Sequence, residues 1–313
     1  MERLFIRQFR PISAIVFLCA ANFCLFGATI IIAQEQVTRP PITGNAQVQV
    51  YVTNPEKAAA FYETSLGYAP APSGCSKQIV ACLCVSSRQQ IQLIAAPSPV
   101  PGNLIAKVAF ASPDVEQMRR YLISKGYAPD SVSSSEDGDK YFTVRDPEGH
   151  AISFVQSPSR SVAALAPGQI STRLIHAGFI VHDRRAEDHF YKDVLGFHLY
   201  WQGGMKDNEV SWVSMQVPDG TDWLEYMLNV PPDASSHVIG IMNHIALGVA
   251  DIQATKQQLL RNGGEPGAEP KLGRDGKWQL NLYDPDDTRI EFMEFKPKEK
   301  PCCSPFTGEH PMP

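Results

Sequence analysis

The chain carries little charge and lacks the basic runs that mark several classes of protein. Charged residues make up 19% of its 313 residues, and the formal net charge is −5. Domains that bind nucleic acid usually show a basic patch or stripe, so we do not expect nucleic acid as a partner. The hydrophobic content of 43% is typical of a globular protein with a substantial core. The length suits two domains of ordinary size.

Cysteine is also sparse, and its spacing does not indicate a zinc site. Seven cysteines occur, and none forms the Cys-x-x-Cys pair found in many structural zinc sites. Cys82 and Cys84 alternate along a strand-like stretch, which favours packed thiols over metal ligands. Cys302 and Cys303 are adjacent in a proline-rich tail, where nothing else in the sequence supports a metal. Export would permit disulfides, but the sequence does not give their pairing.

The N-terminus reads as a targeting segment rather than as part of the fold. Arg3, Arg7 and Arg10 precede an apolar run at residues 12–33, as in a secretory signal. We therefore expect residues 1–34 to be a signal peptide or an N-terminal anchor. The apolar run is long for a cleaved signal and close to the length of a membrane-spanning helix, so cleavage and membrane anchoring both stay open. Either outcome predicts a periplasmic or secreted protein.

Four similar modules follow one another along the rest of the chain. The first and the third each open with an alternating strand, QVQVYV at residues 47–52 and HAGFIV at residues 176–181. Each continues into a helix with a repeated end, FYETSLGY at residues 61–68 and FYKDVLGF at residues 190–197. The glycine in each copy suits a helix C-terminus, where the backbone turns left-handed.

The second and fourth modules match each other in the same way. Residues 107–127 and 244–264 each combine a strand with a helix, for which Asp114 and Asp251 are natural N-caps. Each of the four modules then runs through β-rich sequence to a last strand. A repeat of this size is one supersecondary unit that buries its sheet by pairing with a neighbour.

The repeats predict two α+β domains, each made of two paired modules. The first domain would span residues 45–157 and the second residues 172–297. Residues 156–171 are rich in serine, alanine and proline, and we expect them to form the linker. Residues 298–313 would form a proline-rich tail that extends along the surface or is disordered.

Four polar residues interrupt the apolar strands of the second half. His176 and His244 lie in the first strands of their modules, on the strand face opposite the one that a helix should cover. Glu225 and Glu291 each lie between two apolar residues of a last strand. Imidazoles and ionised carboxylates in such places need partners. They could partner one another, but a metal ion satisfies them better.

The spacing of these residues favours a single metal site. Each module offers one ligand from its first strand and one from its last, at nearly the same separation. Two modules packed face to face would collect all four side chains in one cavity. Two imidazoles and two carboxylates suit one divalent ion such as Zn, Ni, Co, Mn or Fe(II), whose identity stays open. Such an ion can also bind oxygens of water or substrate.

The first half serves as an internal control for this interpretation. Its second module ends in DPEGHAISF where the fourth ends in DPDDTRIEF, so serine stands where the other copy has glutamate. None of the four equivalent positions carries histidine, glutamate or aspartate. We therefore expect the first domain to keep the scaffold and to lack a metal site. The equivalent residues are Gln47, Gln92, Lys107 and Ser153.

In these motifs the chain resembles the vicinal oxygen chelate superfamily, which includes glyoxalase I, bleomycin- and fosfomycin-resistance proteins and extradiol dioxygenases. FYKDVLGF, DPDDTRIEF, HAGFIV and HIALGV carry the resemblance, and it covers nearly all of the two predicted domains. It implies an α+β fold in which paired βαβββ modules form half-open, barrel-like sheets with helices outside. It also implies that the metal ligands are His176, Glu225, His244 and Glu291.

The resemblance implies a metal-dependent enzyme acting on a small substrate with vicinal oxygens. A glyoxalase-like isomerase or lyase would use Glu225 or Glu291 to move a proton. An extradiol-type ring-cleaving dioxygenase would need only His176, His244 and Glu291. The second reading is weaker, because Asn281 stands where those enzymes usually have a tyrosine and because Glu225 would be surplus.

A non-catalytic protein that sequesters a small molecule is a further alternative. Glutathione-dependent methylglyoxal chemistry is chiefly cytosolic, whereas this chain looks exported. The expected partner is a small-molecule substrate, and a homodimer is left open. Five aromatic residues either line an apolar pocket or belong to the ordinary core, and the sequence does not decide between these. They are Tyr200, Trp201, Trp212, Trp223 and Trp278.

Overall fold

The computed structural model describes residues 37–71, 76, 78–136, 138–158 and 166–313. The predicted signal or anchor lies outside these residues, as does the centre of the predicted linker, so the predicted domain boundaries stay predictions. Within the described ranges, no helix is both long and apolar enough to cross a membrane.

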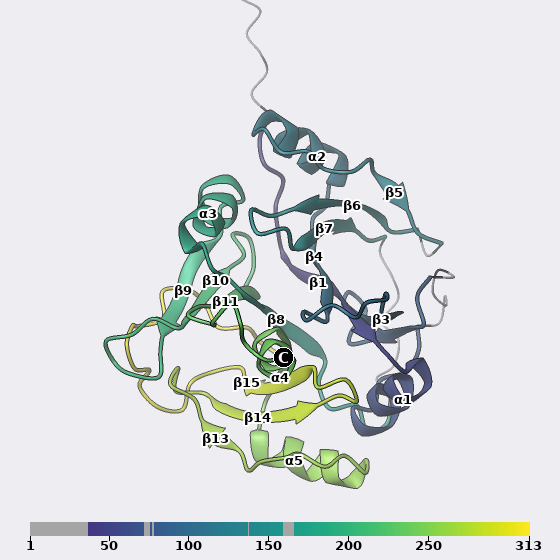
Figure 1. The fold of residues 1–313 in the computed structure, drawn as a ribbon, viewed down its shortest axis with the longest axis vertical. Coiled ribbons are helices and arrows are strands. Elements are labelled where there is room, and N and C mark those ends of the chain that lie inside the picture. Colours follow the sequence, from purple (N-terminus) through teal and green to yellow (C-terminus); the bar gives the residue numbers. More distant parts are fainter. Residues whose placement is uncertain (1–36, 72–75, 77, 137, 159–165) are drawn as a thin grey trace, which may run out of the picture. The chain divides into compact units, whose positions relative to one another are not determined.

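The first domain is a seven-stranded sheet with strand order β2-β3-β1-β4-β7-β6-β5 (Figure 1). The antiparallel pair β1–β4 joins the two modules, and the last strand of each module lies parallel to its first. The strands are β1 (Gly44–Val52), β2 (Ala81–Cys84), β3 (Gln90–Ala95), β4 (Ile105–Ala111), β5 (Ser133–Ser134), β6 (Lys140–Arg145) and β7 (Ala151–Gln156). The helices are α1 (Pro55–Ala60), which continues as a π-helical segment (Phe61–Ser65), and α2 (Val115–Ser124).

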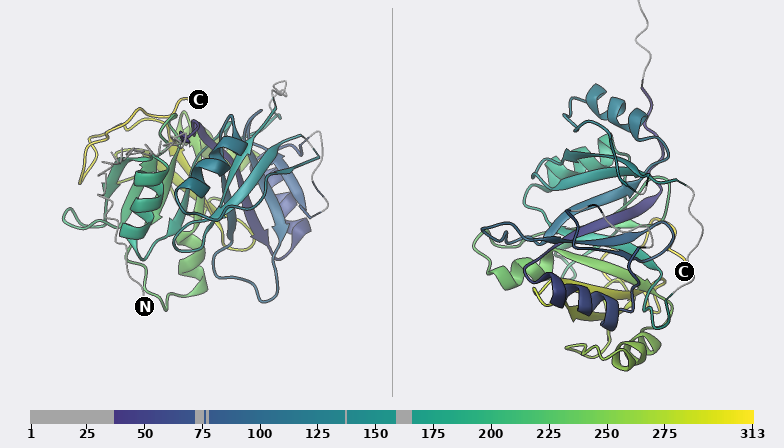
Figure 2. Two further views of the ribbon diagram at one scale, coloured as in Figure 1. Left: turned by 90° about the horizontal axis from the view of Figure 1, so that it is seen from above. Right: turned by 90° about the vertical axis from the view of Figure 1, so that its right-hand side faces the viewer.

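The second domain repeats this plan in an eight-stranded sheet with order β13-β14-β15-β12-β8-β11-β10-β9. The strands are β8 (Arg173–Ile180), β9 (His198–Gly203), β10 (Trp212–Gln216), β11 (Trp223–Met227), β12 (His244–Val249), β13 (Lys271–Leu272), β14 (Trp278–Tyr283) and β15 (Arg289–Glu294). The helices are α3 (Arg184–Asp188), which continues as a π-helical segment (His189–Val194), α4 (Ser236–Met242) and α5 (Ile252–Arg261). Both sheets curl into half-barrels, with α2 and α5 on their outer sides (Figures 1 and 2). The α+β fold expected from the modules is confirmed.

Local sequence explains where the helices begin and end. Asp114 and Asp251 accept hydrogen bonds from backbone N–H groups three residues further on, so both predicted N-caps are confirmed. The glycines that end the repeated FY motifs, Gly67 and Gly196, have φ of 72° and 80°. Only glycine adopts this left-handed backbone without strain, so the chain can turn sharply from helix to strand there.

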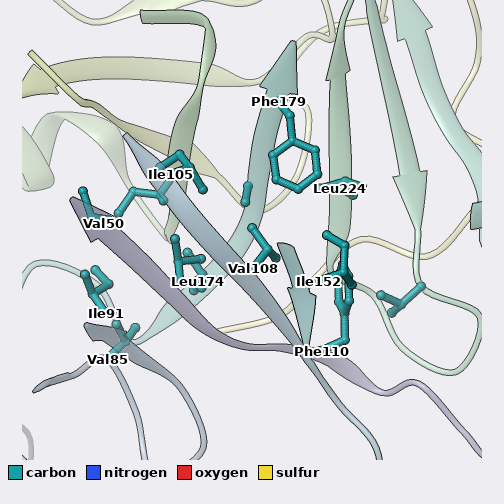
Figure 3. Packing of buried hydrophobic residues seen from close by; sticks show 14 of the residues in the cluster. Val50, Val85, Ile91, Ile105, Val108, Phe110, Ile152, Leu174, Phe179 and Leu224 are labelled. Carbon is teal, nitrogen blue, oxygen red and sulfur yellow. The ribbon is translucent and has the colours of Figure 1, made fainter. Parts of the chain in front are cut away.

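One apolar core extends across both domains. Figure 3 shows Val50, Val108 and Ile152 of the first sheet near Phe179 and Leu224 of the second. Polar residues next to them on the strands, such as Gln49, Lys107, Ser153 and Glu225, face the opposite side of each sheet. Burying one face in this way leaves the other face of each half-barrel free to form a polar cavity.

Residues 298–313 are not simply extended along the surface. Phe306 packs against Tyr200 in a tilted arrangement, with ring centroids 4.8 Å apart, and the backbone N–H of Thr307 donates to the Tyr200 carbonyl at 3.0 Å. The carbonyl of Cys302 accepts a hydrogen bond from the Trp201 indole. The tail is therefore packed against the second sheet.

Candidate metal centre

The four predicted residues meet on one face of the second sheet, on the adjacent strands β15, β12, β8 and β11. Nε2 of His176 lies 3.0 Å from Nε2 of His244. Oε2 of Glu225 is 3.7 Å from the first nitrogen and 3.5 Å from the second. Oε2 of Glu291 is 3.5 Å from each of them. Each residue therefore points one ligand atom at a common centre.

Strand register explains why the four side chains converge. In one row across the sheet, Ala246 lies between His176 and Glu291. In the other row, Gly178 lies between the remaining histidine and glutamate. Each row thus has a small residue in its middle, which leaves space above the sheet for the imidazole and carboxylate to reach each other.

Gly178 is the functional position that the sequence did not reveal. A Cβ atom added there would lie only 2.2 Å from Cε1 and 2.4 Å from Nδ1 of the His244 imidazole. The ring therefore occupies the space that any larger residue would need. Strand alternation places Gly178 on the same face as His176, but only the position of the His244 ring shows why glycine is required.

A hydrogen bond to the backbone orients the His244 imidazole toward the other three side chains. Its Nδ1 lies 2.9 Å from the carbonyl oxygen of Met242, which can only accept, so Nδ1 carries the proton and Nε2 presents a lone pair. The His176 ring stacks on Trp223, with centroids 4.7 Å apart, and its buried Nδ1 has no partner among the described residues. Trp223 thus fixes one ring and a backbone carbonyl fixes the other.

The site is buried and electrostatically coupled. Burial lowers the pKa of His176, only partly opposed by its interaction with Glu291. Burial and Arg289 also favour neutral His244, but the two carboxylates outweigh them and raise its pKa. Burial raises the pKa of both glutamates, yet the histidines reverse this, so the pKa of Glu225 is lowered and that of Glu291 lies well below its usual range. Two ionised carboxylates therefore face one small space, and such a space attracts a cation.

The geometry and chemistry of this donor set fit a divalent ion. Metal bonds of about 2.0–2.2 Å to nitrogen and oxygen place tetrahedral ligand atoms roughly 3.3–3.6 Å apart. The five separations given above, from 3.0 to 3.7 Å, bracket that range. The mixture of imidazole and carboxylate suits Zn and its neighbours in the first transition series.

A cavity of about 250 Å³ opens onto Glu225 and Glu291. Phe306 of the tail also lines it, so the tail completes one wall. Trp278 does not line the cavity and packs against the main core instead. The predicted aromatic residues that do line it are Tyr200, Trp201, Trp212 and Trp223.

Beside this cavity lies a buried charge pair that sequence reasoning missed. Lys277 is fully buried, with its Nζ 4.8 Å from the centre of the Trp223 ring and 3.2 Å from the Tyr200 hydroxyl. Burial lowers the pKa of Lys277 to about 8 and raises the pKa of Asp275 to about 7. Lysine before a strand is ordinarily solvated, so no sequence signal distinguishes this one.

No cysteine of the described residues belongs to the His176, Glu225, His244 and Glu291 cluster. Cys302 and Cys303 form a disulfide with each other, so neither is a thiolate ligand. Cys82 is also disulfide-bonded, so its prediction as a packed thiol is wrong. The sequence left the disulfide pairing open, and the structure gives Cys302–Cys303 as one pair.

Comparisons with known proteins agree with this architecture. Residues 173–292 match the model of the Glyoxalase/Bleomycin resistance protein/Dioxygenase superfamily. Lactoylglutathione lyase of Haemophilus influenzae is 29% identical over 126 residues, which are 40% of this chain and 93% of that protein.

Two solved structures share the fold across both domains. Homoprotocatechuate 2,3-dioxygenase from Brevibacterium fuscum, in complex with 3,4-dihydroxyphenylacetate, superposes with a TM-score of 0.60 at 19% identity, over 87% of this chain and 88% of that one. The enzyme from Arthrobacter globiformis gives a TM-score of 0.61 at 18% identity, over 82% and 80%. The second domain thus matches the Glyoxalase/Bleomycin resistance protein/Dioxygenase superfamily model over residues 173–292, and the solved structures share the fold of both domains.

Proposed function

We propose that the second domain binds one divalent metal ion and that the protein is a glyoxalase-type isomerase or lyase. The observation that carries this proposal is the position of Glu225. Its Oε2 lies 3.5–3.7 Å from the two imidazole Nε2 atoms, which is nearly the same distance as for Oε2 of Glu291. A set of two histidines and one glutamate would leave this buried carboxylate without a role.

The chain's own residues suit the transfer of a proton between neighbouring carbon atoms. A bound ion would supply Lewis acidity toward two adjacent oxygens of a substrate in the cavity. The Glu225 carboxylate lines that cavity, and Ser214 holds its second oxygen through a hydrogen bond of 3.3 Å. From there it can take a proton from the carbon beside a carbonyl and return it to the next carbon. The aromatic walls limit the access of water to this exchange.

The size of the cavity favours a small substrate. A volume of about 250 Å³ is below the range of roughly 300–1,000 Å³ that holds drug-sized ligands. The curated relative is named for a lactoyl group carried on glutathione. We propose that this chain acts on the smaller part of such a molecule, a dicarbonyl or hydroxycarbonyl compound.

Metal analysis followed by a substrate panel tests the proposal. Purified protein should contain about one divalent ion per chain, and it should turn over a dicarbonyl such as methylglyoxal, free or as a thiol adduct, without oxygen. Glu225→Gln should abolish that turnover, whereas the control Glu63→Gln, at an exposed glutamate of the first domain, should not change it. Turnover of a catechol that needs Fe(II) and oxygen and survives Glu225→Gln would instead establish a ring-cleaving dioxygenase. A filled site without turnover of either class would indicate a binding protein.

Export remains a separate part of the proposal and depends on residues 1–34 alone. Expression of the full chain in a bacterial host, followed by fractionation, would test it. The folded part should appear outside the cytoplasm, either released or attached to the membrane. Recovery of the chain in the cytoplasm with its N-terminus intact would contradict export.

A further inference from the structure

The first domain carries its own polar cavity, of about 560 Å³, on the sheet face that corresponds to the metal centre. Strand register defines the correspondence. Lys107 on β4 pairs with Gln49 on β1, which pairs in turn with Gln92 on β3. The residues in the same places of the second sheet are His244, Gly178 and Glu225. The ammonium of Lys107 therefore comes from the position that supplies a metal ligand in the other domain.

Lys107 lacks a counter-ion in direct contact. Its Nζ lies over the Tyr141 ring, 5.5 Å from the centroid, and within the described residues it makes no hydrogen bond or ion pair. Burial lowers the pKa of Lys107, and the more distant charge of Asp130 opposes this only in part. A partly desolvated ammonium gains most from an anion that binds directly to it, because charge-assisted hydrogen bonds are the strong ones.

The floor of the cavity is made of amides that are already oriented. Gln49 donates to Oε1 of Gln92 at 2.8 Å, and Gln92 donates to Oε1 of Gln90 at 3.2 Å. Gln47 donates to Oδ2 of Asp139 at 3.3 Å. Each amide keeps a second N–H and carbonyl lone pairs for other partners. A hydroxyl group both donates and accepts, so it suits this surface better than an apolar group does.

The charges set a limit on the ligand. Lys107 offers one positive charge, while the buried carboxylate of Asp139 would repel a second negative charge on the ligand and accept a hydroxyl. We propose that the cavity of the first domain binds a small hydroxylated monocarboxylate, with its carboxylate on Lys107 and its hydroxyls on the glutamine amides. This site does not depend on a metal in the second domain.

Calorimetric titration of the full chain with gluconate tests the site. Gluconate should bind, and Lys107→Gln should weaken its affinity by about tenfold or more, the effect of losing one charge-assisted hydrogen bond. Lys107→Arg keeps the charge and should retain most of the affinity. Lys57→Gln, a change at an exposed lysine, should have no effect. Equal binding by the Lys107→Gln variant would overturn the proposal, as would the absence of gluconate binding to the unaltered protein.

Two further measurements separate this site from the second domain. Hydroxy acids also chelate metals, so the titration is repeated with His244→Ala, in which gluconate should still bind the first domain. Loss of all binding in that variant would assign gluconate to the metal centre and overturn the proposal. Sorbitol lacks the carboxylate and acetate lacks the hydroxyls, so each should bind the unaltered protein more weakly than gluconate. Sorbitol binding as tightly as gluconate would also overturn it, whether or not any Lys107 variant folds.

Discussion

At the scale of single residues, the corresponding faces of the two sheets differ at two facing positions. Where the second domain has His244 facing Gly178, the first has Lys107 facing Gln49. Glycine leaves room for an imidazole that points at the proposed metal position, whereas glutamine fills the same space and hydrogen-bonds to its neighbour. In the first domain, the Lys107 ammonium provides the positive charge that a metal ion would provide in the second. A side chain on one strand thus decides what the facing side chain can do.

Gly178→Ala should remove most of the bound metal. The new Cβ would overlap the His244 ring, which would have to leave the position from which its Nε2 faces the other three ligands. The matched control is Gly267→Ala, because no atom lies within 4 Å of a Cβ at that exposed glycine. Metal content of the two variants, measured on folded protein, checks this. Full occupancy in Gly178→Ala would show that the ring is not held as described.

Replacing one of the four proposed metal ligands should lower both the metal content and the stability of the protein. His244→Ala or Glu291→Gln should lose most of the metal, and the remaining ionised side chains would be left buried without a partner. Chelation of the unaltered protein should lower its melting temperature for the same reason, since metal binds the folded state alone. The double change Gln47→Ala with Gln92→Ala should leave metal content unchanged. A second ion per chain that this change removes would contradict a metal-free first domain.

At the scale of elements, the sequence carried most of the information that the site needs. Strand alternation and the repeated modules were enough to place His176 and Glu291 on one face, because a strand's period of two leaves little choice. The features that could not be predicted arise from tertiary packing. The burial of Lys277 and the requirement at Gly178 depend on side chains from distant strands. Likewise, nothing local indicated that Phe306 in the tail would complete the cavity wall.

Helix α5 should depend on its N-cap for stability but not for metal binding. Asp251 accepts a hydrogen bond of 2.8 Å from the Ala254 N–H, and the helix lies on the outer side of the second sheet. Asp251→Ala should lower the free energy of unfolding by about 1 kcal/mol. Asp251→Asn keeps an acceptor and should lose less. Urea unfolding with metal analysis measures both effects, and a loss of metal in Asp251→Ala would link the helix to the site.

At the scale of the whole chain, the two domains dock through the motifs that the repeats share. The Tyr62 hydroxyl of one FY motif donates to Asp284 in the DP turn of the other domain, at 3.2 Å. In the same way, the Tyr191 hydroxyl donates to Asp146 at 3.0 Å. The carboxylate two residues after each DP aspartate then accepts backbone N–H groups at the start of the opposite domain's first helix. The motifs that identified the repeats thus also join the two domains in a pseudo-twofold manner.

The interface between the two domains contains a carboxyl group, Glu187, whose titration should make the free energy of unfolding depend on pH. Glu187 on α3 is fully buried and accepts the backbone N–H of Glu148 from the first domain at 3.0 Å. Burial, and next the charge of Asp146, raises the pKa of Glu187 to about 9. The folded protein therefore binds a proton here that the unfolded chain, with an ordinary glutamate, has lost by neutral pH. Stability from this group is present below the unfolded pKa and is lost as the pH rises toward the folded pKa.

Glu187→Gln should remove that pH dependence, because the amide is neutral and keeps an oxygen for the Glu148 N–H. Near pH 4 the variant and the unaltered protein should be about equally stable. Near pH 8 the variant should be more stable, by up to about 5 kcal/mol, since it has no proton to lose. Denaturant unfolding of both proteins between these values measures the difference, and buried carboxyls remote from Glu187 affect the two proteins alike. Parallel stability curves would show that Glu187 is ionised in the folded protein and that the domain interface accommodates its charge.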